Sequence, residues 1–298
     1  MGYIKVDSKE IYIEAYGKEN EHTIVYFHGG PGAGCSDFRQ QAKILGKNYH
    51  VIIFDQYGCW RSEAISENEP FGMTDHVKLI DKMREILDIQ SWIVLGHSYR
   101  GMLACLYAHT YPEYTKAVIY ECPSWDFILS AKSIAAFLIP YFTRINSEEG
   151  LINCHELINK SYINRCNAIN DILAILNMVE YGKERNYIHG ISIEEFDKYS
   201  YDPDLPDNNW QKNEIHYNKI FESCEMVNDY LPYLKKIKQP SLLLVGKYDP
   251  ACGNDQREYF RKYSRNGTVV EFENSGHFPR LEEPEAYTKA IINFLFKI

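Results

Sequence analysis

The stretch SWIVLGHSYRGMLACLYAHTYPE, residues 91–113, decides the fold. Its short apolar start predicts a buried strand, and the rest follows a helical pattern that stops near Pro112. Between the two, Gly96 and Ser98 match the first and third positions of the pentapeptide Gly-x-Ser-x-Gly, and Arg100 stands at the last. That pentapeptide forms a sharp strand-to-helix turn that exposes a nucleophilic serine. The stretch therefore predicts an α/β sheet with Ser98 at the carboxyl end of a strand.

The sequence around this turn alternates between strand and helix patterns. HTIVYFHGG and HVIIFDQYG are continuous apolar runs closed by glycine, which is typical of buried parallel strands. TDHVKLIDKMREILDI has apolar residues at helical spacing, and KAVIYECP is a further strand pattern. YIKVDS and EIYIEAYG alternate apolar and polar residues, which predicts an antiparallel hairpin. The first third thus predicts a mostly parallel central sheet with helices on both faces.

The pattern changes between residues 124 and 234. Polar, asparagine-rich segments with helical spacing, such as SEEGLINCHELINKSYINRCNAINDILAILNMVEYG, replace the strand patterns there. Strands return after Pro240 with SLLLVGKYD and GTVVEFENSG, and EPEAYTKAIINFLFKI predicts a final amphipathic helix. We therefore expect a core domain of residues 1–123 and 235–298, with residues 124–234 inserted as a helical cap domain over the carboxyl edge of the sheet.

Composition limits the classes of function. The chain has 298 residues, of which 45% are hydrophobic and 24% charged, and its net charge is -9. This charge argues against a nucleic-acid partner, and no apolar run approaches the roughly 20 residues that a membrane span needs. The first residues show no basic segment followed by an apolar core, so we expect no secretory signal and a cytoplasmic location. The sequence does not predict the oligomeric state.

The spacing of the cysteines favours reduced thiols. No two of the eight form a C-x-x-C pair, and a long cytoplasmic chain favours free thiols over disulfides. GGPGAG lacks the Lys-Ser/Thr pair of a phosphate-binding loop. We therefore expect neither a metal nor a cofactor. The eight are Cys35, Cys59, Cys105, Cys122, Cys154, Cys166, Cys224 and Cys252.

Three residues that follow predicted strands form a candidate catalytic group. Ser98 needs a base to remove its proton, and His277, after the last predicted strand, lies in a loop suited to that base. Asp249, just past the preceding strand, could orient His277. Simpler alternatives are an N-cap role for Ser98 and a turn-forming role for Asp249 before Pro250. However, the chain order Ser, Asp, His is that of the α/β-hydrolase triad, which predicts that fold.

A glycine-rich run supplies a fourth part of the candidate site. In YFHGGPGAG, Gly29, Gly30 and Gly32 let the backbone come close to a ligand. A backbone N–H of this run could pair with that of Tyr99 as an oxyanion hole. The alternative is an ordinary glycine-rich turn.

At this point the chain resembles a known family. HGGPGAG, FDQYGCWRS, GHSYRG, GKYDPACG and GHFPRLEEPE, which lie between Phe27 and Pro284, together resemble the proline iminopeptidases of the α/β-hydrolase fold. NEIHYNKIF in the expected cap is similar to an acidic segment of bacterial members. The resemblance implies release of an N-terminal proline, or another small apolar residue, from short peptides.

The resemblance also implies a role for each candidate residue. Ser98 would attack the scissile carbonyl, His277 would take its proton, and Asp249 would orient His277. Gly30 and Tyr99 would donate backbone N–H groups to the oxyanion.

The substrate-binding residues would be Gly29 and carboxylates of the cap. In this family such carboxylates hold the free ammonium group of the substrate. Glu214 is the first candidate and Glu222 the second, and the alternative for both is a solvated helix face.

The chain departs from the family pattern at three positions. Tyr57 and Trp60 replace an arginine and a glycine, and Arg100 replaces the last glycine of the pentapeptide, although Gly101 follows it. One hypothesis is that Trp60 and Arg100 changed together, with the guanidinium lying on the indole face.

Three readings of the function stay open. The first is a serine exopeptidase that acts on N-terminal residues. The second is an esterase or lactonase that acts on small acyl substrates, since the acyl-transfer chemistry is shared and the fold does not settle the substrate. The third is a catalytically impaired binding protein in which Arg100 distorts the turn around Ser98. Carboxylates that face Ser98 favour the first, an apolar lid the second, and a Ser98 beyond the reach of His277 the third.

Overall fold

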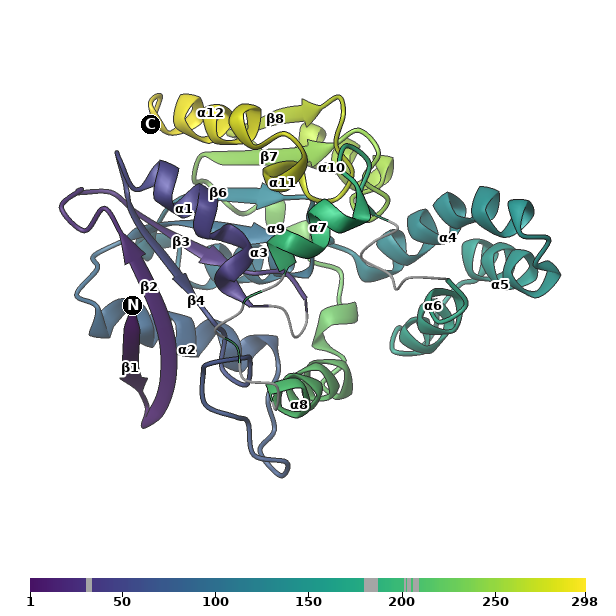
Figure 1. Ribbon diagram of the computed structural model, residues 1–298, viewed down its shortest axis with the longest axis horizontal. Coiled ribbons are helices and arrows are strands. Elements are labelled where there is room, and N and C mark those ends of the chain that lie inside the picture. The colour runs from purple at the N-terminus through teal and green to yellow at the C-terminus, as the bar shows by residue number, and fades with distance from the viewer. Residues whose placement is uncertain (31–33, 180–186, 201, 203–204, 206–208) are drawn as a thin grey trace.

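A sheet of eight strands forms the centre of the described part of the molecule, in the order β1-β2-β4-β3-β5-β6-β7-β8. The computed structural model describes residues 1–30, 34–179, 187–200, 202, 205 and 209–298, so Gly32 lies outside the described residues. Neighbours from β4 to β8 are parallel, whereas β2 is antiparallel to both β1 and β4 (Figure 1). The strands are β1 (Gly2–Val6), β2 (Lys9–Tyr16), β3 (Thr23–Phe27), β4 (His50–Phe54), β5 (Trp92–His97), β6 (Thr115–Glu121), β7 (Ser241–Gly246) and β8 (Gly267–Phe272).

The expected hairpin at the start of the chain is confirmed. Val6 of β1 pairs with Lys9 of β2, so Asp7 and Ser8 form a two-residue turn. Both turn residues have positive φ, 49° and 71°, which matches the right-handed twist of paired strands. Only part of this hairpin is buried, as its alternating sequence predicts.

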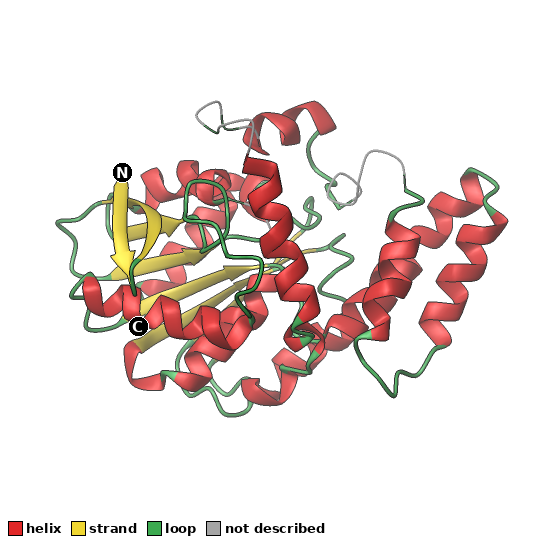
Figure 2. Ribbon diagram, turned by 90° about the horizontal axis from the view of Figure 1, so that it is seen from below, coloured by secondary structure: helices red, strands yellow, loops and turns green. Residues whose placement is uncertain are grey.

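Helices cover both faces of the sheet (Figure 2). Successive residues of a strand point to opposite faces, so the fully buried strands contribute to two apolar clusters. Val25 and Phe27 pack on one face, and Ile24 and Tyr26 on the other. The first cluster includes residues of α2 (Met73–Ile86), α3 (Tyr99–Thr110) and α10 (Asn254–Tyr263), and the second includes residues of α1 (Arg39–Leu45) and α12 (Pro284–Leu295).

Helices α4, α5 and α6 of the segment between β6 and β7 lie beyond the carboxyl ends of the strands (Figure 1). A third apolar cluster joins α4, α5 and α6 to Ala251, Phe278 and Leu281, which follow β7 and β8. The segment therefore packs on the loops at the carboxyl edge. Its helices are α4 (Phe127–Arg144), α5 (Glu148–Asn159), α6 (Asn167–Leu176), α7 (Ile193–Ser200), α8 (Asn209–Glu222) and α9 (Leu231–Leu234).

The expected fold class, a mostly parallel sheet with helices on both faces, is confirmed by this arrangement. Short helical turns join the main elements: η1 (Cys35–Phe38), η2 (Pro112–Tyr114), η4 (Glu225–Val227) and α11 (Pro279–Glu282). Across the described residues, no helix combines the length and apolar character needed to cross a bilayer.

Candidate active site

Ser98 occupies the turn between β5 and α3. Its φ and ψ are 58° and -129°, a conformation that side-chain-bearing residues rarely adopt. The backbone around it fixes this turn, because the Ser98 N–H donates to the Glu121 carbonyl at 2.9 Å and its own carbonyl accepts from Gly101 at 2.8 Å. The turn thus holds the Ser98 side chain at the carboxyl edge of the sheet.

The glycines of the turn allow close packing around it. A Cβ on Gly96 would lie 2.3 Å from the Arg100 carbonyl oxygen, and one on Gly101 would lie 2.4 Å from Cβ of Pro123. Both distances are far below van der Waals contact. Gly101 therefore allows α3 to approach the loop after β6, while residue 100 itself can carry a side chain.

His277 and Asp249 form a hydrogen-bonded chain with Ser98. His277 Nε2 lies 2.8 Å from Ser98 Oγ, and His277 Nδ1 lies 2.7 Å from Asp249 Oδ1. Because a carboxylate only accepts, Nδ1 carries the proton and Nε2 accepts from the serine hydroxyl. The Asp249 carboxylate also accepts from the backbone N–H groups of Ala251 at 2.9 Å and Cys252 at 3.1 Å. The structure therefore brings the three residues together in the order that nucleophilic catalysis needs.

The environment of His277 is mostly aromatic. The rings of His97 and Tyr187 lie 4.9 and 5.6 Å from the His277 ring between centroids. Burial, and then the Arg280 guanidinium, lowers the pKa of His97 well below its usual value, so His97 is neutral beside the triad. The His277 backbone N–H donates to the Tyr187 carbonyl at 2.8 Å. These contacts hold the imidazole while adding no second charge next to it.

The predicted oxyanion residues lie at the same cavity. Tyr99 is the first residue of α3, so its N–H has no acceptor within the helix. Gly30 has a φ of 124°, which favours glycine, and a Cβ on Gly29 would lie 2.7 Å from Cδ2 of His97. Gly29, Gly30 and Tyr99 all line the cavity beside Ser98.

That cavity has a volume of about 520 Å³, which suits a small ligand. Most of its wall is apolar, and most of these apolar side chains come from the segment between β6 and β7. Its polar side chains include Ser36, Asp37, Asp197 and Arg280. The apolar wall includes Trp60, Met102, Phe127, Ile134, Ile172, Leu173, Leu176, Phe196, Phe221, Met226, Phe278 and Leu281.

The two predicted cap carboxylates do not face this cavity. Glu214 and Glu222 are exposed, and Glu222 lies 3.4 Å from Lys219 in an ion pair. Asn213, His216 and Ile220 form the buried face of α8, and both glutamates lie outside that face. Both residues therefore match the alternative, a solvated helix face, and the geometry gives no support to a substrate-binding role.

Two other carboxylates do line the cavity, and the sequence analysis missed both. Asp197 of α7 follows the buried Phe196, and only the helical phase of IEEFDKYS could have indicated it. Asp37 of η1 is paired with Arg280, which also donates to Glu121 at 2.8 Å. Burial raises the pKa of the Asp37 carboxyl, although Arg280 opposes that shift.

The hypothesis that Arg100 lies on Trp60 is wrong. The Arg100 guanidinium lies 4.3 Å from the centroid of the Tyr99 ring, and its nitrogens contact His76 and His216 at 3.1 and 3.0 Å. Trp60 instead lines the cavity, and a Cβ on Gly34 would lie 2.6 Å from its Cδ1. The arginine is thus directed to the rings of His76 on α2 and His216 on α8.

The expectation of reduced thiols is corrected at one pair. Cys166 and Cys224 form a disulfide with a Cα–Cα distance of 5.7 Å, which suits such a bond. The sequence separation of 58 residues gave no sign of this pair, since α6 and the turn after α8 meet only in the folded chain. The other six cysteines are buried and keep their thiols, as expected.

One group among the described residues could offer three ligands to a metal ion. Its members are Cys122, Asp249 and His277, whose ligand atoms lie within 4.8 Å of one another. Asp249 and His277 already bond to each other and to Ser98, so a metal ion here would compete with the Ser98–His277–Asp249 chain.

Comparisons with known proteins place this geometry in a family. A model of the alpha/beta hydrolase fold matches residues 22–284. The proline iminopeptidase of Heyndrickxia coagulans is 25% identical over 303 residues, which cover 100% of this chain and 99% of that protein. Among solved structures, the proline iminopeptidase-related protein of Thermus thermophilus has a TM-score of 0.78 at 19% identity and covers 99% of this chain and 96% of its own. The enol-lactonase of Burkholderia xenovorans has a TM-score of 0.64 at 16% identity and covers 99% of both chains.

These matches confirm two of the expectations drawn from the sequence. The α/β-hydrolase fold is confirmed, and so is the resemblance to proline iminopeptidases. The two solved structures share less than a quarter of their residues with this chain, so they bear on the fold alone.

Proposed function

This chain belongs to the alpha/beta hydrolase fold family, and on that premise we propose that it is a serine hydrolase that releases an N-terminal residue from short peptides. The observation that carries the proposal is the chain of hydrogen bonds from Ser98 through His277 to Asp249 at the wall of the cavity. A Ser98 hydroxyl 2.8 Å from His277 argues against the impaired binding protein, which would need the two apart.

The reaction proceeds by acyl transfer to Ser98. His277 Nε2 takes the hydroxyl proton as Ser98 attacks the scissile carbonyl, and Asp249 stabilises the imidazolium that forms. The N–H groups of Gly30 and Tyr99 hold the oxyanion. His277 then gives the proton to the leaving amine, and a water molecule repeats the attack to release the acyl group.

Asp197 holds the free ammonium group of the substrate in this proposal. An exopeptidase needs a negative group at a fixed distance from the nucleophile, and Asp197 is the carboxylate that the helical segment contributes to the cavity wall among the residues described. Residues 124–234 then act as the cap domain, because their helices supply this carboxylate and most of the apolar wall. The small peptide is the partner that this arrangement accepts.

An arylamide assay tests the proposal. Proline and alanine arylamides should be hydrolysed, and acetylation of their amine should abolish the reaction, because the acetylated amine carries no charge for Asp197. Asp197→Asn should raise KM for the free-amine substrates about tenfold or more, the loss expected when one charged contact disappears. Glu222→Gln is the matched control, since Glu222 is exposed and outside the cavity, and its KM should match the wild type.

The acyl-ester reading is the second candidate, and the apolar wall of the cavity favours it. Hydrolysis of short acyl esters together with no hydrolysis of either arylamide would overturn the exopeptidase proposal in its favour. Equal activity on free and acetylated amines would also overturn it, because Asp197 would then have no amine to recognise.

A further inference from the structure

Arg100 is a fully buried cation with an unusual set of partners. It stands in the first turn of α3, two residues after Ser98, and none of its side chain reaches solvent. Its NH1 group contacts His76 Nδ1 at 3.1 Å and its NH2 group contacts His216 Nε2 at 3.0 Å. No carboxylate pairs with it among the residues that the structure describes. A buried charge without a counter-charge is costly, and the hydrogen bonds to the two histidines offset part of that cost.

Both histidines accept hydrogen bonds from Arg100. His216 Nδ1 lies 2.8 Å from the Tyr57 carbonyl, so Nδ1 carries the proton and Nε2 is the acceptor. His76 accepts through Nδ1, which leaves its proton on Nε2. Burial, and then Arg100, lowers the pKa of both histidines well below the usual value. The guanidinium therefore joins two neutral rings, one on α2 and one on α8.

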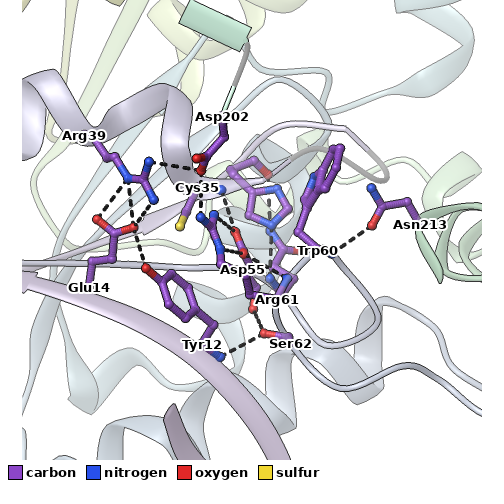
Figure 3. A network of polar contacts seen from close by, with 12 residues as sticks. Tyr12, Glu14, Cys35, Arg39, Asp55, Trp60, Arg61, Ser62, Asp202 and Asn213 are labelled. Atoms are coloured by element: carbon purple, nitrogen blue, oxygen red, sulfur yellow. Dashed lines mark hydrogen bonds and ion pairs between the residues drawn. The ribbon is translucent and has the colours of Figure 1, made fainter. Parts of the chain in front are cut away.

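Helix α8 in turn holds the loop that carries Trp60. Asn213 Oδ1 accepts from the Trp60 N–H at 2.8 Å, as Figure 3 shows, and Lys212 Nζ donates to the Trp60 and Ser62 carbonyls at 2.6 and 2.8 Å. His216 holds the Tyr57 carbonyl of the same loop. The loop 55–62 is thus bound to α8 at both ends.

A second link ties the same loop to the helical segment. Figure 3 shows Asp202 between Arg61 and Arg39, at 2.7 and 3.0 Å. Arg61 also binds Asp55 at 2.6 Å, so ion pairs hold the side of the loop that faces Asp202. On the side that faces α8 the described residues form hydrogen bonds and no such ion pair, and His216, which binds the Tyr57 carbonyl there, is itself held by Arg100.

A series of contacts links Arg100 to the cavity wall. Trp60, on the held loop, and Phe221, on α8, both line the cavity beside Ser98. A continuous path of contacts therefore runs from Arg100 through His216 and α8 to two aromatic side chains that would meet a substrate.

We propose that Arg100 is a positioning residue that holds α8 and the loop 55–62 against the turn of Ser98, and so sets the shape of the substrate cavity. It acts through His216 and touches no reacting atom. A glycine at position 100 would make none of these contacts. The proposal rests on the proposed hydrolytic function, because its kinetic effects are read from that activity.

Arg100→Met tests the proposal, because methionine retains much of the stem and removes the donors. Amide hydrogen exchange of α8 should become at least about tenfold faster, whereas exchange of α5 should not change. With the substrate that the wild type hydrolyses, KM should rise about tenfold and kcat should change less than about threefold, since the triad is intact. Ser98 should react with a fluorophosphonate, a serine-directed reagent, at close to the wild-type rate.

Two further variants separate positioning from a general loss of stability. Arg84→Met is the matched control, because Arg84 is also a buried arginine but binds Asp81 and the Ile89 carbonyl away from the cavity. It should leave α8 exchange and KM unchanged. His216→Phe should reproduce the effects of Arg100→Met, and the double variant should be no worse than the worse single one, because both remove one contact path.

The outcomes decide both proposals separately. Unchanged α8 exchange in Arg100→Met, equal effects in Arg84→Met, or additive effects with His216→Phe would each overturn the positioning role. Should Arg100→Met not fold, Arg100→Lys applies the same test, because lysine keeps a donor for one histidine. Its KM should rise about threefold, which is half of the tenfold change on a logarithmic scale. A wild type that is inert to arylamides overturns the peptidase alone, because α8 exchange decides the role of Arg100 without a substrate.

Discussion

Ser98 combines an unfavourable backbone conformation with a favourable set of contacts. Residues held at φ 58° and ψ -129° are strained, and such strain persists only where the surrounding structure enforces it. Here the enforcing contacts are the hydrogen bonds to Glu121 and Gly101. In this turn the Ser98 Oγ lies 2.8 Å from His277 Nε2.

Ser98→Ala should lower kcat more than about 10³-fold for any substrate that the wild type hydrolyses, because the nucleophile is lost while the cavity is kept. Ser124→Ala is the control, since Ser124 also lines the cavity but its hydroxyl contacts Ser130 at 2.5 Å. Steady-state rates of purified variants give the measurement. Residual activity within about tenfold of the wild type would remove Ser98 from the mechanism.

The sequence predicted that Ser98, Asp249 and His277 meet, because each follows a strand whose apolar run is easy to recognise. The structure brings their side chains together, and their catalytic roles stay a prediction. It did not place Glu214 or Asp197, because helical phase shows which residues share a face but not which residues of that helix meet the cavity. It also could not find the partners of Arg100, which lie 24 and 116 residues away in the chain. Contacts between elements that are distant in the chain can be seen only in the structure, and they determine which side chains line the cavity.

At the scale of elements, the strands were more predictable than the helices between residues 124 and 234. Continuous apolar runs such as TIVYF and SLLLVG are buried over their whole length in β3 and β7, so their pattern is unambiguous. The helices α5 and α8 carry many polar residues and are only partly buried, and α8 packs against Trp60 and Arg100, which lie far from it in the chain. The division into a core of 1–123 and 235–298 with a cap of 124–234 stays a prediction.

The disulfide between Cys166 and Cys224 joins the start of α6 to the turn after α8. A cross-link that closes a loop of this length stabilises a protein by about 2–4 kcal/mol, chiefly by restricting the unfolded chain. Dithiothreitol should therefore lower the Tm of the wild type. Thermal unfolding followed by circular dichroism measures the change.

Cys166→Ser provides the control for that prediction. Its Tm should already be lowered, and dithiothreitol should lower it no further. If the reagent lowered the Tm of both proteins equally, the change would come from something other than this bond. A wild-type Tm that does not respond to the reagent would contradict the cross-link itself.

At the scale of the whole molecule, four buried histidines make folding sensitive to pH. Burial is the main cause in each case: it lowers the pKa of His28 to about 3 and lowers those of His76, His97 and His216 well below the usual value. The unfolded chain binds protons near pH 6.5, while the folded protein does not, so acid favours unfolding. Burial raises the pKa of Asp37 and Glu121, and these carboxyls act in the opposite direction.

The contribution of these histidines to the free energy of unfolding should therefore be constant above about pH 7. It should fall as the pH drops below about 6.5. His76→Asn isolates one of the four groups, because the Asn amide oxygen can still accept from Arg100 but does not titrate. Between pH 6.5 and 5, the slope for this variant should be shallower by up to about 1.4 kcal/mol per pH unit. Urea unfolding at several pH values measures it.

His155→Asn is the matched control for that slope, because His155 is exposed on α5 and the substitution is the same. Its unfolding free energy should follow the wild-type pH dependence throughout. Asp37 and Glu121, whose pKa values are raised, are present in all three proteins, so their opposing contribution cancels in the comparison. If His76→Asn kept the wild-type slope, His76 would not be a neutral buried ring in the folded protein, and the hydrogen bond assigned between Arg100 and its Nδ1 would be wrong.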